Sequence, residues 1–383
     1  MHQAGNDAER HRSGGDAAAI AEAQFGFGGR RAPIVRGMPD DPGGFVFCRL
    51  QYESAWRFPS GYGWSTDYPR SDRNFKLAMM LGIAYGCSIG GLATLIGTPP
   101  NALLAGFMEE AYGIRIGFGQ WMLVGVPLVL VTLPLTWFVL TRLIFPVGRS
   151  EIPGGRQLLE GQRREIGSMT HPELVLSVVV AIVALAWVLQ PLLVRVMPGL
   201  SDAGIAIIGA LAMFVIPVSL RDREFLLDWA TAARLPWDVL ILFGGGLSLA
   251  GAISRTGLAE WIGESLGGLA AWPTIAVTVA VTMVVIFLTE LTSNTATAAA
   301  FLPVVGSVAV GMGVDPLMLA VPAALAASCA FMLPVATPPN AIVYGTGHVR
   351  IADMARAGIV LNLLFTGAIT LLTYSLVGYV FTR

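Results

Sequence analysis

The sequence predicts an all-α polytopic membrane protein made of two related halves, each containing a helix that is broken partway along. Apolar residues make up 55% of the chain and charged residues only 13%, whereas a soluble protein carries roughly 25% charge. Long apolar stretches alternate with short loops that contain arginine, a pattern typical of membrane-spanning helices. The pentapeptide Thr-Pro-Pro-Asn-Ala also occurs twice, both times within apolar sequence.

The two copies of this motif lie in Gly97–Gly106 (GTPPNALLAG) and Ala336–Gly345 (ATPPNAIVYG). Two adjacent prolines interrupt a regular helix, because proline removes a backbone donor and its ring clashes with the preceding turn. At membrane depth such an interruption persists only where protein or a polar cavity satisfies the freed backbone groups. Paired breaks in corresponding places of two halves indicate the binding site of a secondary transporter. We therefore expect an inverted-repeat transporter with broken helices.

The first 74 residues differ from the rest of the chain. Residues 1–74 are rich in charge and glycine and contain no apolar run long enough to span a membrane, so we expect them to be irregular or disordered. A remnant of a first repeat then covers 75–146, a cytoplasmic linker 147–172 and a second repeat 173–383. The expected elements are a broken helix at 76–109, spans at 119–146, 173–194, 203–220 and 237–256, a hairpin at 273–312, a broken helix at 317–347, a last span at 357–381, and a short interfacial segment at 225–236.

The basic residues predict how these spans are oriented. Basic side chains are enriched in cytoplasmic loops of membrane proteins. Twelve lie in one set of connections, namely Arg70, Arg73, Lys76, Arg149, Arg156, Arg163, Arg164, Arg221, Arg223, Arg234, Arg350 and Arg356, and three lie in the other, namely Arg115, Arg195 and Arg255. The first set is therefore expected in the cytoplasm and the C-terminus outside, in the inner (plasma) membrane. This alternation requires 273–312 to cross an even number of times, as a re-entrant hairpin or as two full spans. We favour the hairpin, because each arm is short for a crossing.

The tip of this hairpin is polar and reads Thr289-Glu290-Leu291-Thr292-Ser293-Asn294-Thr295-Ala296-Thr297. Its neutral oxygens and the free carbonyls of an interrupted helix suit a cation such as Na⁺, whereas helix N-termini suit an anion. Small polar residues also join helices in membranes, but their position at a helix break favours a binding site. No Lys or Arg occurs between Arg255 and Arg350. Because an unpaired anion is costly in low dielectric, a bound anion and a bound cation would assist each other, which predicts coupled symport.

Glu290 is the sole acidic residue between Glu264 and Asp315. An intramembrane carboxylate is a functional candidate, and it could either contribute to an ion site or brace the tip through hydrogen bonds. Both alternatives remain open from sequence. The cysteines show no disulfide or metal spacing and the four histidines do not cluster, so no metal centre or cofactor is expected apart from a coupling ion. We also expect no nucleic-acid partner.

Three stretches resemble the divalent anion:sodium symporter family, which contains Na⁺-coupled dicarboxylate, citrate and sulfate carriers. They are SIGGLATLIGTPPNALL at 88–104, TELTSNTATAAAFLPV at 289–304 and LPVATPPNAIVYG at 333–345. The resemblance runs from about Asn74 to the C-terminus. It implies a homodimer in the lipid bilayer, with a scaffold domain and a mobile transport domain that moves as an elevator.

The resemblance also implies roles for individual residues, partly through their backbone carbonyls. The Na⁺ ligands would be Thr289, Thr292, Asn294, Ala336 and, at a second site, Gly97. The substrate-binding residues would be Ser293, Asn294, Thr295, Thr337, Pro338, Thr98 and Pro99. The chain departs from the family in its first repeat: the position that corresponds to a first Ser-Asn-Thr motif reads Ser54-Ala55-Trp56, and the preceding spans and first hairpin are absent. The first repeat is therefore expected to be incomplete, and residues 1–74 to be a non-native segment of a truncated or altered carrier.

These features predict Na⁺-coupled symport of a divalent anion, with a C4-dicarboxylate such as succinate favoured over sulfate or citrate. The alternative is a transport-incompetent fragment that acts as a scaffold or partner subunit, which the missing first motif would favour. An enzyme is not expected. An intramembrane hydrolase would need catalytic partners near Ser293, but His348 is expected at a cytoplasmic end, far from the Ser293 tip, and the sequence shows no paired catalytic acids or metal cluster.

Overall fold

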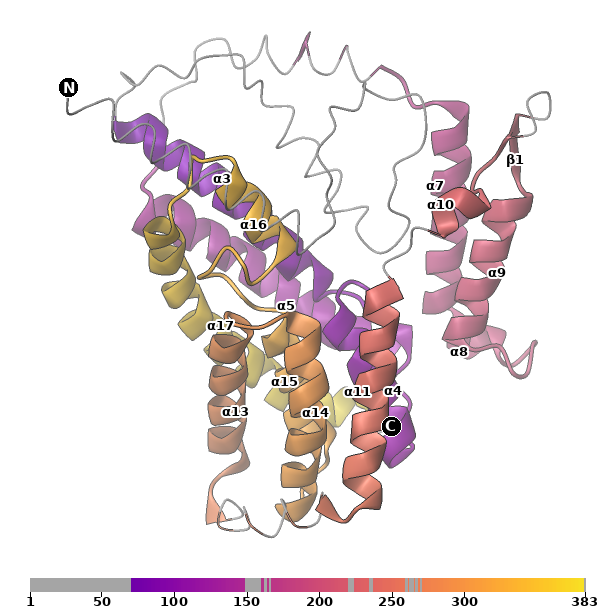
Figure 1. The fold of residues 1–383 in the computed structure, drawn as a ribbon, viewed down its shortest axis with the longest axis vertical. Coiled ribbons are helices and arrows are strands. Elements are labelled where there is room, and N and C mark those ends of the chain that lie inside the picture. Colours follow the sequence, from indigo (N-terminus) through magenta and orange to yellow (C-terminus); the bar gives the residue numbers. More distant parts are fainter. Residues whose placement is uncertain are drawn as a thin grey trace.

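The computed structural model describes residues 70–148, 167–219, 224–233, 237–258 and 271–381, together with residues 160, 161, 164, 261, 265 and 268. The segment 1–69, including Ser54, and most of the expected linker 147–172 lie outside the described residues. The described chain is mainly helical, and its elements surround one apolar core that extends from the first broken helix to the last helix. Figure 1 shows the main helices crossing near the centre of the molecule.

Two broken helices form the centre of the fold. The first consists of α3 (Arg70–Gly91) and α4 (Pro99–Tyr112), and the second of α15 (Leu317–Ala327) and α16 (Pro338–Gly345). Each helix after a break packs against the helix before the other break: α4 lies against α15, and α16 lies against α3. The breaks begin earlier than the sequence predicted, because the prolines start the second helix rather than occupy the gap. Proline is favoured at the first helical position, where its missing N–H leaves no bond unmade.

A long helix follows each broken helix. The predicted span 119–146 is α5 (Phe118–Phe138), which continues as a π-helical segment, η1 (Val139–Ile144). The predicted span 357–381 is α17 (Ile351–Phe381), which begins before its expected start. The two long helices pack against each other and connect the two halves of the molecule (Figure 1).

The segment predicted as a hairpin forms two helices, α13 (Thr274–Thr289) and α14 (Asn294–Gly311), joined by a tight turn. Ser293 caps the second helix, since its hydroxyl accepts a hydrogen bond from the Ala296 N–H at 3.2 Å. The hairpin packs on α15 and α17, and α14 also contacts α4. The polar tip therefore faces the broken helices rather than standing alone.

Of the remaining elements, α11 packs against α4 and α14, whereas the others form a peripheral group (Figure 1). Predicted span 173–194 divides at Leu189 into α7 and α8, and predicted span 203–220 ends early, where the chain enters a two-stranded antiparallel ribbon. Helix α7 begins at a capping box in which the Glu173 carboxylate accepts from the Thr170 N–H at 2.7 Å. The elements are α7 (His171–Val188), α8 (Gln190–Leu193), α9 (Asp202–Val215), β1 (Pro217–Ser219), β2 (Glu224–Phe225), α10 (Trp229–Ala232) and α11 (Trp237–Arg255).

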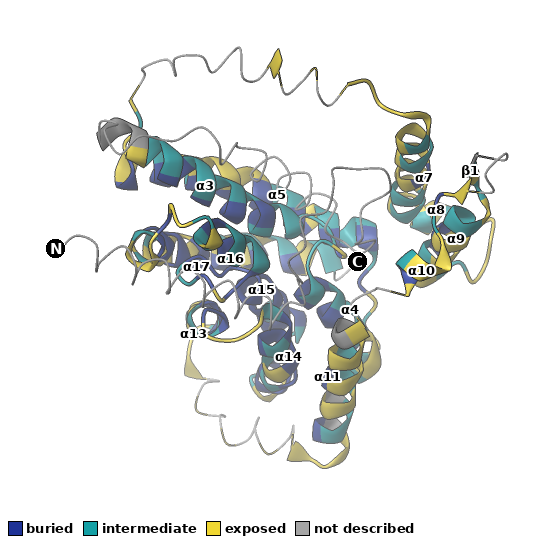
Figure 2. Cartoon of the chain, turned by 45° about the horizontal axis from the view of Figure 1, so that its top comes forward, coloured by how far each residue is buried: buried dark blue, intermediate teal, exposed yellow. Residues whose placement is uncertain are grey.

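Several helices expose apolar side chains on the outside of the molecule. Among the described residues, four helical segments are long and apolar enough to cross a membrane: Phe118–Ile144, His171–Val188, Asn294–Gly311 and Ile351–Phe381. Figure 2 shows that α15 is almost completely buried, whereas α7, α9 and α11 are largely exposed. Apolar side chains such as Ile182 and Leu211 are exposed on these outer helices. The chain is thus an all-α, multi-pass membrane protein apart from the short ribbon.

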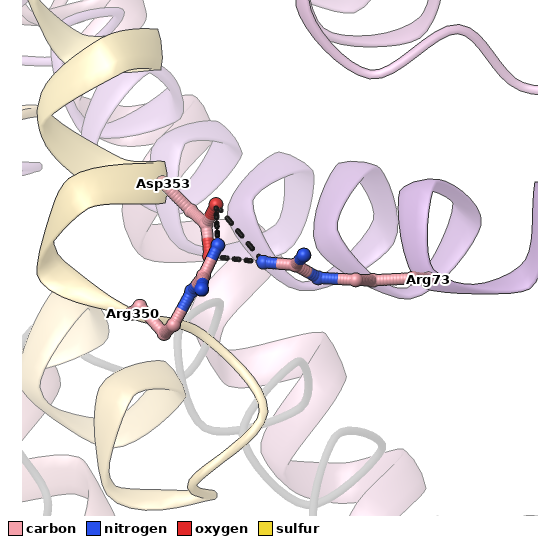
Figure 3. A network of polar contacts seen from close by, with 3 residues as sticks. All are labelled: Arg73, Arg350 and Asp353. Atoms are coloured by element: carbon pink, nitrogen blue, oxygen red, sulfur yellow. Dashed lines mark hydrogen bonds and ion pairs between the residues drawn. The ribbon is translucent and has the colours of Figure 1, made fainter. Parts of the chain in front are cut away.

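One end of the molecule carries a network that joins the two halves. The Asp353 carboxylate at the start of α17 accepts hydrogen bonds from Arg73 in α3 at 3.0 and 3.2 Å, and from Arg350 at the same two distances (Figure 3). Both arginines belong to the set predicted in the cytoplasm. Burial, together with the charge of Lys76, lowers the pKa of nearby His348. This histidine is therefore neutral at pH 7 and adds no positive charge to that end.

Candidate functional site

The second break is a loop whose shape is held by its own motif. Thr337 has an extended backbone and caps α16, and Pro338 is the first residue of that helix. The side chain of Asn340 turns back and donates hydrogen bonds to the carbonyls of Ala330 at 3.0 Å and Leu333 at 3.1 Å. Asn340 is completely buried. The motif therefore supplies both the start of a helix and the donor that satisfies the loop before it.

The first break has the same construction. Thr98 has an extended backbone and precedes α4, and Asn101 donates to the carbonyls of Thr94 at 3.0 Å and Gly91 at 3.4 Å. These acceptors stand seven and ten residues before the asparagine, as in the second break. The backbone agrees as well: the Gly97 N–H donates to Thr94 O, just as the Ala336 N–H donates to Leu333 O. The repeated sequence thus forms a repeated structure.

The hairpin tip is attached to the end of α15. Thr289, which is fully buried, has its Oγ1 at 2.7 Å from the Ala327 carbonyl oxygen and 3.0 Å from Asn294 Oδ1. The hydroxyls of Thr292 and Thr297 contact each other across the turn. Thr295 is buried at the start of α14, whereas Ser293 is exposed. Several oxygen atoms are therefore gathered within one helical turn of the tip.

The first break meets the same end of α15. The hydroxyl of Ser328, the residue after Ala327, donates to Thr98 Oγ1 at 3.0 Å. Consecutive residues Ala327 and Ser328 thus contact the hairpin tip on one side and the first Thr-Pro-Pro motif on the other. Three interruptions that are far apart in sequence converge at the C-terminus of α15. This convergence defines the candidate site.

Glu290 connects the tip to the second break. Its buried carboxylate accepts hydrogen bonds from the backbone N–H groups of three consecutive residues, Phe331 at 2.7 Å, Met332 at 2.9 Å and Leu333 at 3.0 Å. A fourth bond, at 2.9 Å, comes from the Asn362 side chain on α17. The sequence left open whether Glu290 contributes to an ion site or braces the tip through hydrogen bonds, and these contacts favour the brace.

The structure brings most of the expected site residues together, but not all of them by direct contact. Thr289 and Asn294 touch each other, and Thr98 reaches α15. Pro99 and Pro338 are half-buried at the starts of their helices. Among the described residues, no hydrogen bond links Ala336 or Thr337 to the hairpin tip; Glu290 provides the connection to their loop instead. Gly97 belongs to the first loop, where an added Cβ would lie 2.2 Å from Gly91 O.

Several supporting residues were not anticipated from sequence. The Tyr85 hydroxyl donates to Phe331 O at 2.7 Å, and the Trp121 indole N–H donates to Leu92 O at 3.1 Å. A signal existed for these residues, since buried tyrosine and tryptophan need a partner for their polar atoms. Asn362 could also have been noticed as an amide within an apolar span.

Two close approaches of glycine complete the support of the loops. A Cβ on Gly125 in α5 would lie 2.4 Å from Leu92 O, and one on Gly358 in α17 would lie 2.5 Å from three backbone atoms of Phe331 and Met332. Each long helix therefore passes directly over one loop. Which glycine makes such a contact depends on packing, so sequence alone offers no signal.

Comparisons with known proteins agree with this architecture. The family model described as the sodium:sulfate symporter transmembrane region matches residues 44–382, a range that includes the last part of the segment 1–74. The sodium-dependent dicarboxylate transporter SdcS of Staphylococcus saprophyticus is 42% identical over 313 residues, covering 81% of this chain and 60% of the relative. SdcS of Staphylococcus aureus strain USA300 is 42% identical over 308 residues, covering 79% and 59%.

The chain thus spans about 60% of the length of these curated relatives. The family and the named relatives are transporters rather than enzymes. The matched range contains both Thr-Pro-Pro-Asn loops, the hairpin and every helix described above. Because the family model covers most of its length, the chain belongs to the divalent anion:sodium symporter family.

Proposed function

We propose that this chain forms the core of a Na⁺-coupled symporter for a divalent anion, with a C4-dicarboxylate such as succinate as its preferred substrate. One observation carries the proposal: the hairpin tip and the first broken helix both contact the end of α15, through Ala327 and Ser328. Broken helices that converge near the middle of a bundle are how secondary transporters form a site. The printed names of the relatives, which are dicarboxylate transporters, support the choice of substrate.

Na⁺ is the proposed co-substrate, and the oxygen atoms present suit it. Hard cations prefer carbonyl, amide and hydroxyl oxygens. Thr289, Thr292 and Asn294 offer such oxygens at the tip, and Ala336 and Gly97 offer loop carbonyls. Asn101 and Asn340 each have a buried Oδ1 with no hydrogen-bond donor among the described groups. Oxygens of this kind gain from a nearby cation, because a buried acceptor without a partner is costly.

The anion is proposed to bind at the N-termini of three helices. Free N–H groups and the helix dipole favour negative charge there. The residues at these N-termini are Ser293, Asn294 and Thr295 on α14, Thr337 and Pro338 on α16, and Thr98 and Pro99 at α4. Since the sequence between Arg255 and Arg350 contains no Lys or Arg, a bound Na⁺ would provide the positive charge. This mutual dependence is the proposed basis of coupling.

An elevator movement in a homodimer, in the inner (plasma) membrane, completes the proposal. The tip and both loops are joined by side-chain hydrogen bonds and by Glu290, so they would move together as one body. Arg73 and Arg350 share one carboxylate at one end of the molecule (Figure 3). That end is proposed to face the cytoplasm, with the C-terminus outside.

Uptake of radiolabelled succinate into proteoliposomes tests the proposal, with an inward Na⁺ gradient or with K⁺ in its place. Na⁺-dependent uptake is expected. Asn294→Ala should abolish it while leaving expression near normal, because the substitution removes an oxygen from both proposed sites. Asn74→Ala is the matched control, since Asn74 donates to Pro146 O at the edge of the molecule, away from the tip and the loops. Equal rates in Na⁺ and K⁺ would contradict the coupling.

Sulfate is a second candidate substrate, because the matching family model is named for sodium:sulfate symport. Unlabelled sulfate and citrate added in excess distinguish the candidates. If succinate is the substrate, unlabelled succinate should compete and sulfate should not. Thr337→Val should weaken substrate affinity more than Na⁺ affinity. Equal losses of the two affinities would argue against direct contact between Thr337 and the anion. No uptake of succinate, sulfate or citrate would identify a chain that does not transport alone.

A further inference from the structure

Glu290 is unusual because its charge is met by backbone amides. Its side chain is 3% exposed and lies in the turn between α13 and α14. The four donors within 3.0 Å are three consecutive N–H groups of the second loop and the Asn362 amide. Among the described residues, no basic side chain forms an ion pair with it. Multiple N–H donors are what a buried carboxylate needs in the absence of a cation.

The loop that Glu290 binds is held through its N–H groups and through several of its carbonyls. Its N–H groups at 331–333 go to the carboxylate. Its carbonyls go elsewhere: Ala330 and Leu333 accept from Asn340, and Phe331 accepts from Tyr85. Because both sets of groups have partners from different elements, the loop is held from several directions. Because Glu290 belongs to the turn of the hairpin, its carboxylate joins the loop to the hairpin.

The first loop shows that the motif can form without such a carboxylate. The N–H groups of Leu92 and Ala93, which correspond to Phe331 and Met332, donate to local carbonyls of Ile89 and Gly90. The asparagine brace is nevertheless the same in both loops. Glu290 is therefore not required by the local shape of a Thr-Pro-Pro-Asn loop. Its distinct effect is to fasten one element of the site to another.

We propose that Glu290 is a positioning residue that sets the spacing between the hairpin tip and the second loop, and thereby the affinity for Na⁺. The residue next to it, Thr289, contacts Asn294, and both belong to the proposed Na⁺ ligands. Ala336, a further proposed ligand, follows the loop residues that Glu290 binds. A change in the carboxylate would alter the distance between the two ligand groups without removing any ligand. The inference rests on the proposed Na⁺ coupling.

Glu290→Gln in the full chain tests this role, with two measurements in detergent. Hydrogen exchange reports the amides at 331–333, and thermal unfolding at constant ionic strength reports the Na⁺ concentration that gives half the maximal stabilisation. Gln retains the shape but replaces one acceptor oxygen with a donor, so at least one loop N–H loses its partner. We expect faster exchange at 331–333 and about a tenfold rise in the Na⁺ midpoint, because a lost hydrogen bond of ordinary strength corresponds to roughly that factor.

Glu109→Gln is the matched control, because Glu109 is an exposed carboxylate that pairs with Arg115 away from the site. It should leave the Na⁺ midpoint unchanged. Asn362→Ala removes one of the four donors to Glu290 without replacing a residue of the tip or of the loop, and should raise the midpoint by a smaller factor. If Glu290→Gln does not fold, the Na⁺ midpoint of Asn362→Ala tests the positioning role instead. Glu290→Asp keeps the charge and should fall between Gln and the wild type.

The outcomes separate this inference from the proposed function. Lower thermal stability of Glu290→Gln with an unchanged Na⁺ midpoint would make the carboxylate merely structural and overturn the inference. Unchanged exchange at 331–333 would overturn it as well. If the wild type takes up succinate with Na⁺ and all variants retain its midpoint, the function stands and the inference fails. If Na⁺ neither stabilises the wild type nor drives uptake, both fail.

Discussion

The two Thr-Pro-Pro-Asn loops share one local design but differ in what surrounds them. In both, the asparagine binds carbonyls seven and ten residues earlier, and a glycine of the following long helix lies against the loop backbone. The second loop also donates backbone hydrogen bonds to Glu290 of the hairpin. The first loop instead accepts a hydrogen bond from Trp121 of α5. The comparison shows that the motif determines the loop, while the neighbouring elements determine what the loop is attached to.

The helices that precede the two loops differ in the same way. Residues 319–327 of α15 are buried throughout, because α13, α14 and α17 surround this helix. Helix α3 is buried on one side only (Figure 2). Its other side, with α5 and η1, lines a cavity of about 540 Å³ that includes Gly82, Gly86, Trp137 and Arg142. The two motifs have the same sequence but different neighbours. Substitutions at corresponding positions of the two loops therefore measure how much the neighbouring helices contribute to stability.

The largest effects are expected where a helix lies directly on a loop. Gly358→Ala would place a Cβ 2.5 Å from the backbone of Phe331 and Met332, and Gly125→Ala would place one 2.4 Å from Leu92 O. Backbone atoms cannot move aside easily, so each should destabilise the protein by about 3 kcal/mol or more. Thermal unfolding in detergent measures this. Gly367→Ala on α17 is the control, because its Cβ would meet nothing within 4 Å.

Gly367→Ala should be neutral or slightly stabilising, as alanine favours a helix interior. Equal tolerance of alanine at Gly358 and Gly367 would show that α17 does not press on the second loop. A tolerated Gly125→Ala together with a damaging Gly358→Ala would instead show that the first loop can move away, which would strengthen the contrast between the two halves.

Intermediate effects are expected for the two asparagines. Asn340→Ala leaves the buried carbonyls of Ala330 and Leu333 without their donor, and Asn101→Ala does the same to Gly91 and Thr94. An unsatisfied buried group costs about 1–3 kcal/mol. Asn340→Ala should be the more damaging, because its bonds measure 3.0 and 3.1 Å and those of Asn101 measure 3.0 and 3.4 Å. Thermal unfolding of the two variants, compared side by side, measures the difference. The reverse order would contradict the view that the second loop is the more tightly held.

The smallest effect is expected at the edge of the molecule. Asp353→Asn weakens the bonds to Arg73 and Arg350, whose side chains are 52% and 66% exposed. Exposed ion pairs contribute roughly 0–1 kcal/mol, and salt screens them. The melting temperature should fall by a few degrees at most, and less at high salt. A large loss that is independent of salt would mean that this network, rather than the loops, holds the two halves together.

Much of the site could be predicted from sequence, because its signals are local. Two prolines in an apolar segment require a break, and a polar stretch around Ser-Asn-Thr between two apolar arms indicates the tip of a hairpin. Both breaks and two helices that meet at the polar tip were therefore anticipated, while the re-entrant path of this hairpin stays a prediction. The prolines were expected within the gap rather than at the start of α4 and α16. The division at Leu189 and the ribbon after α9 were missed, since continuous hydropathy does not reveal where a helix turns.

Sequence by itself determined the apolar spans, the two broken helices and the polar tip, since a proline ring or a capping hydroxyl acts on its own neighbours wherever the chain goes. Only the tertiary structure decided that the three interruptions meet at Ala327 and Ser328, that Glu290 binds a loop on another helix, and that Gly358 passes over it. These contacts join residues far apart in the chain, and they depend on how helices of similar hydropathy pack, which composition does not encode.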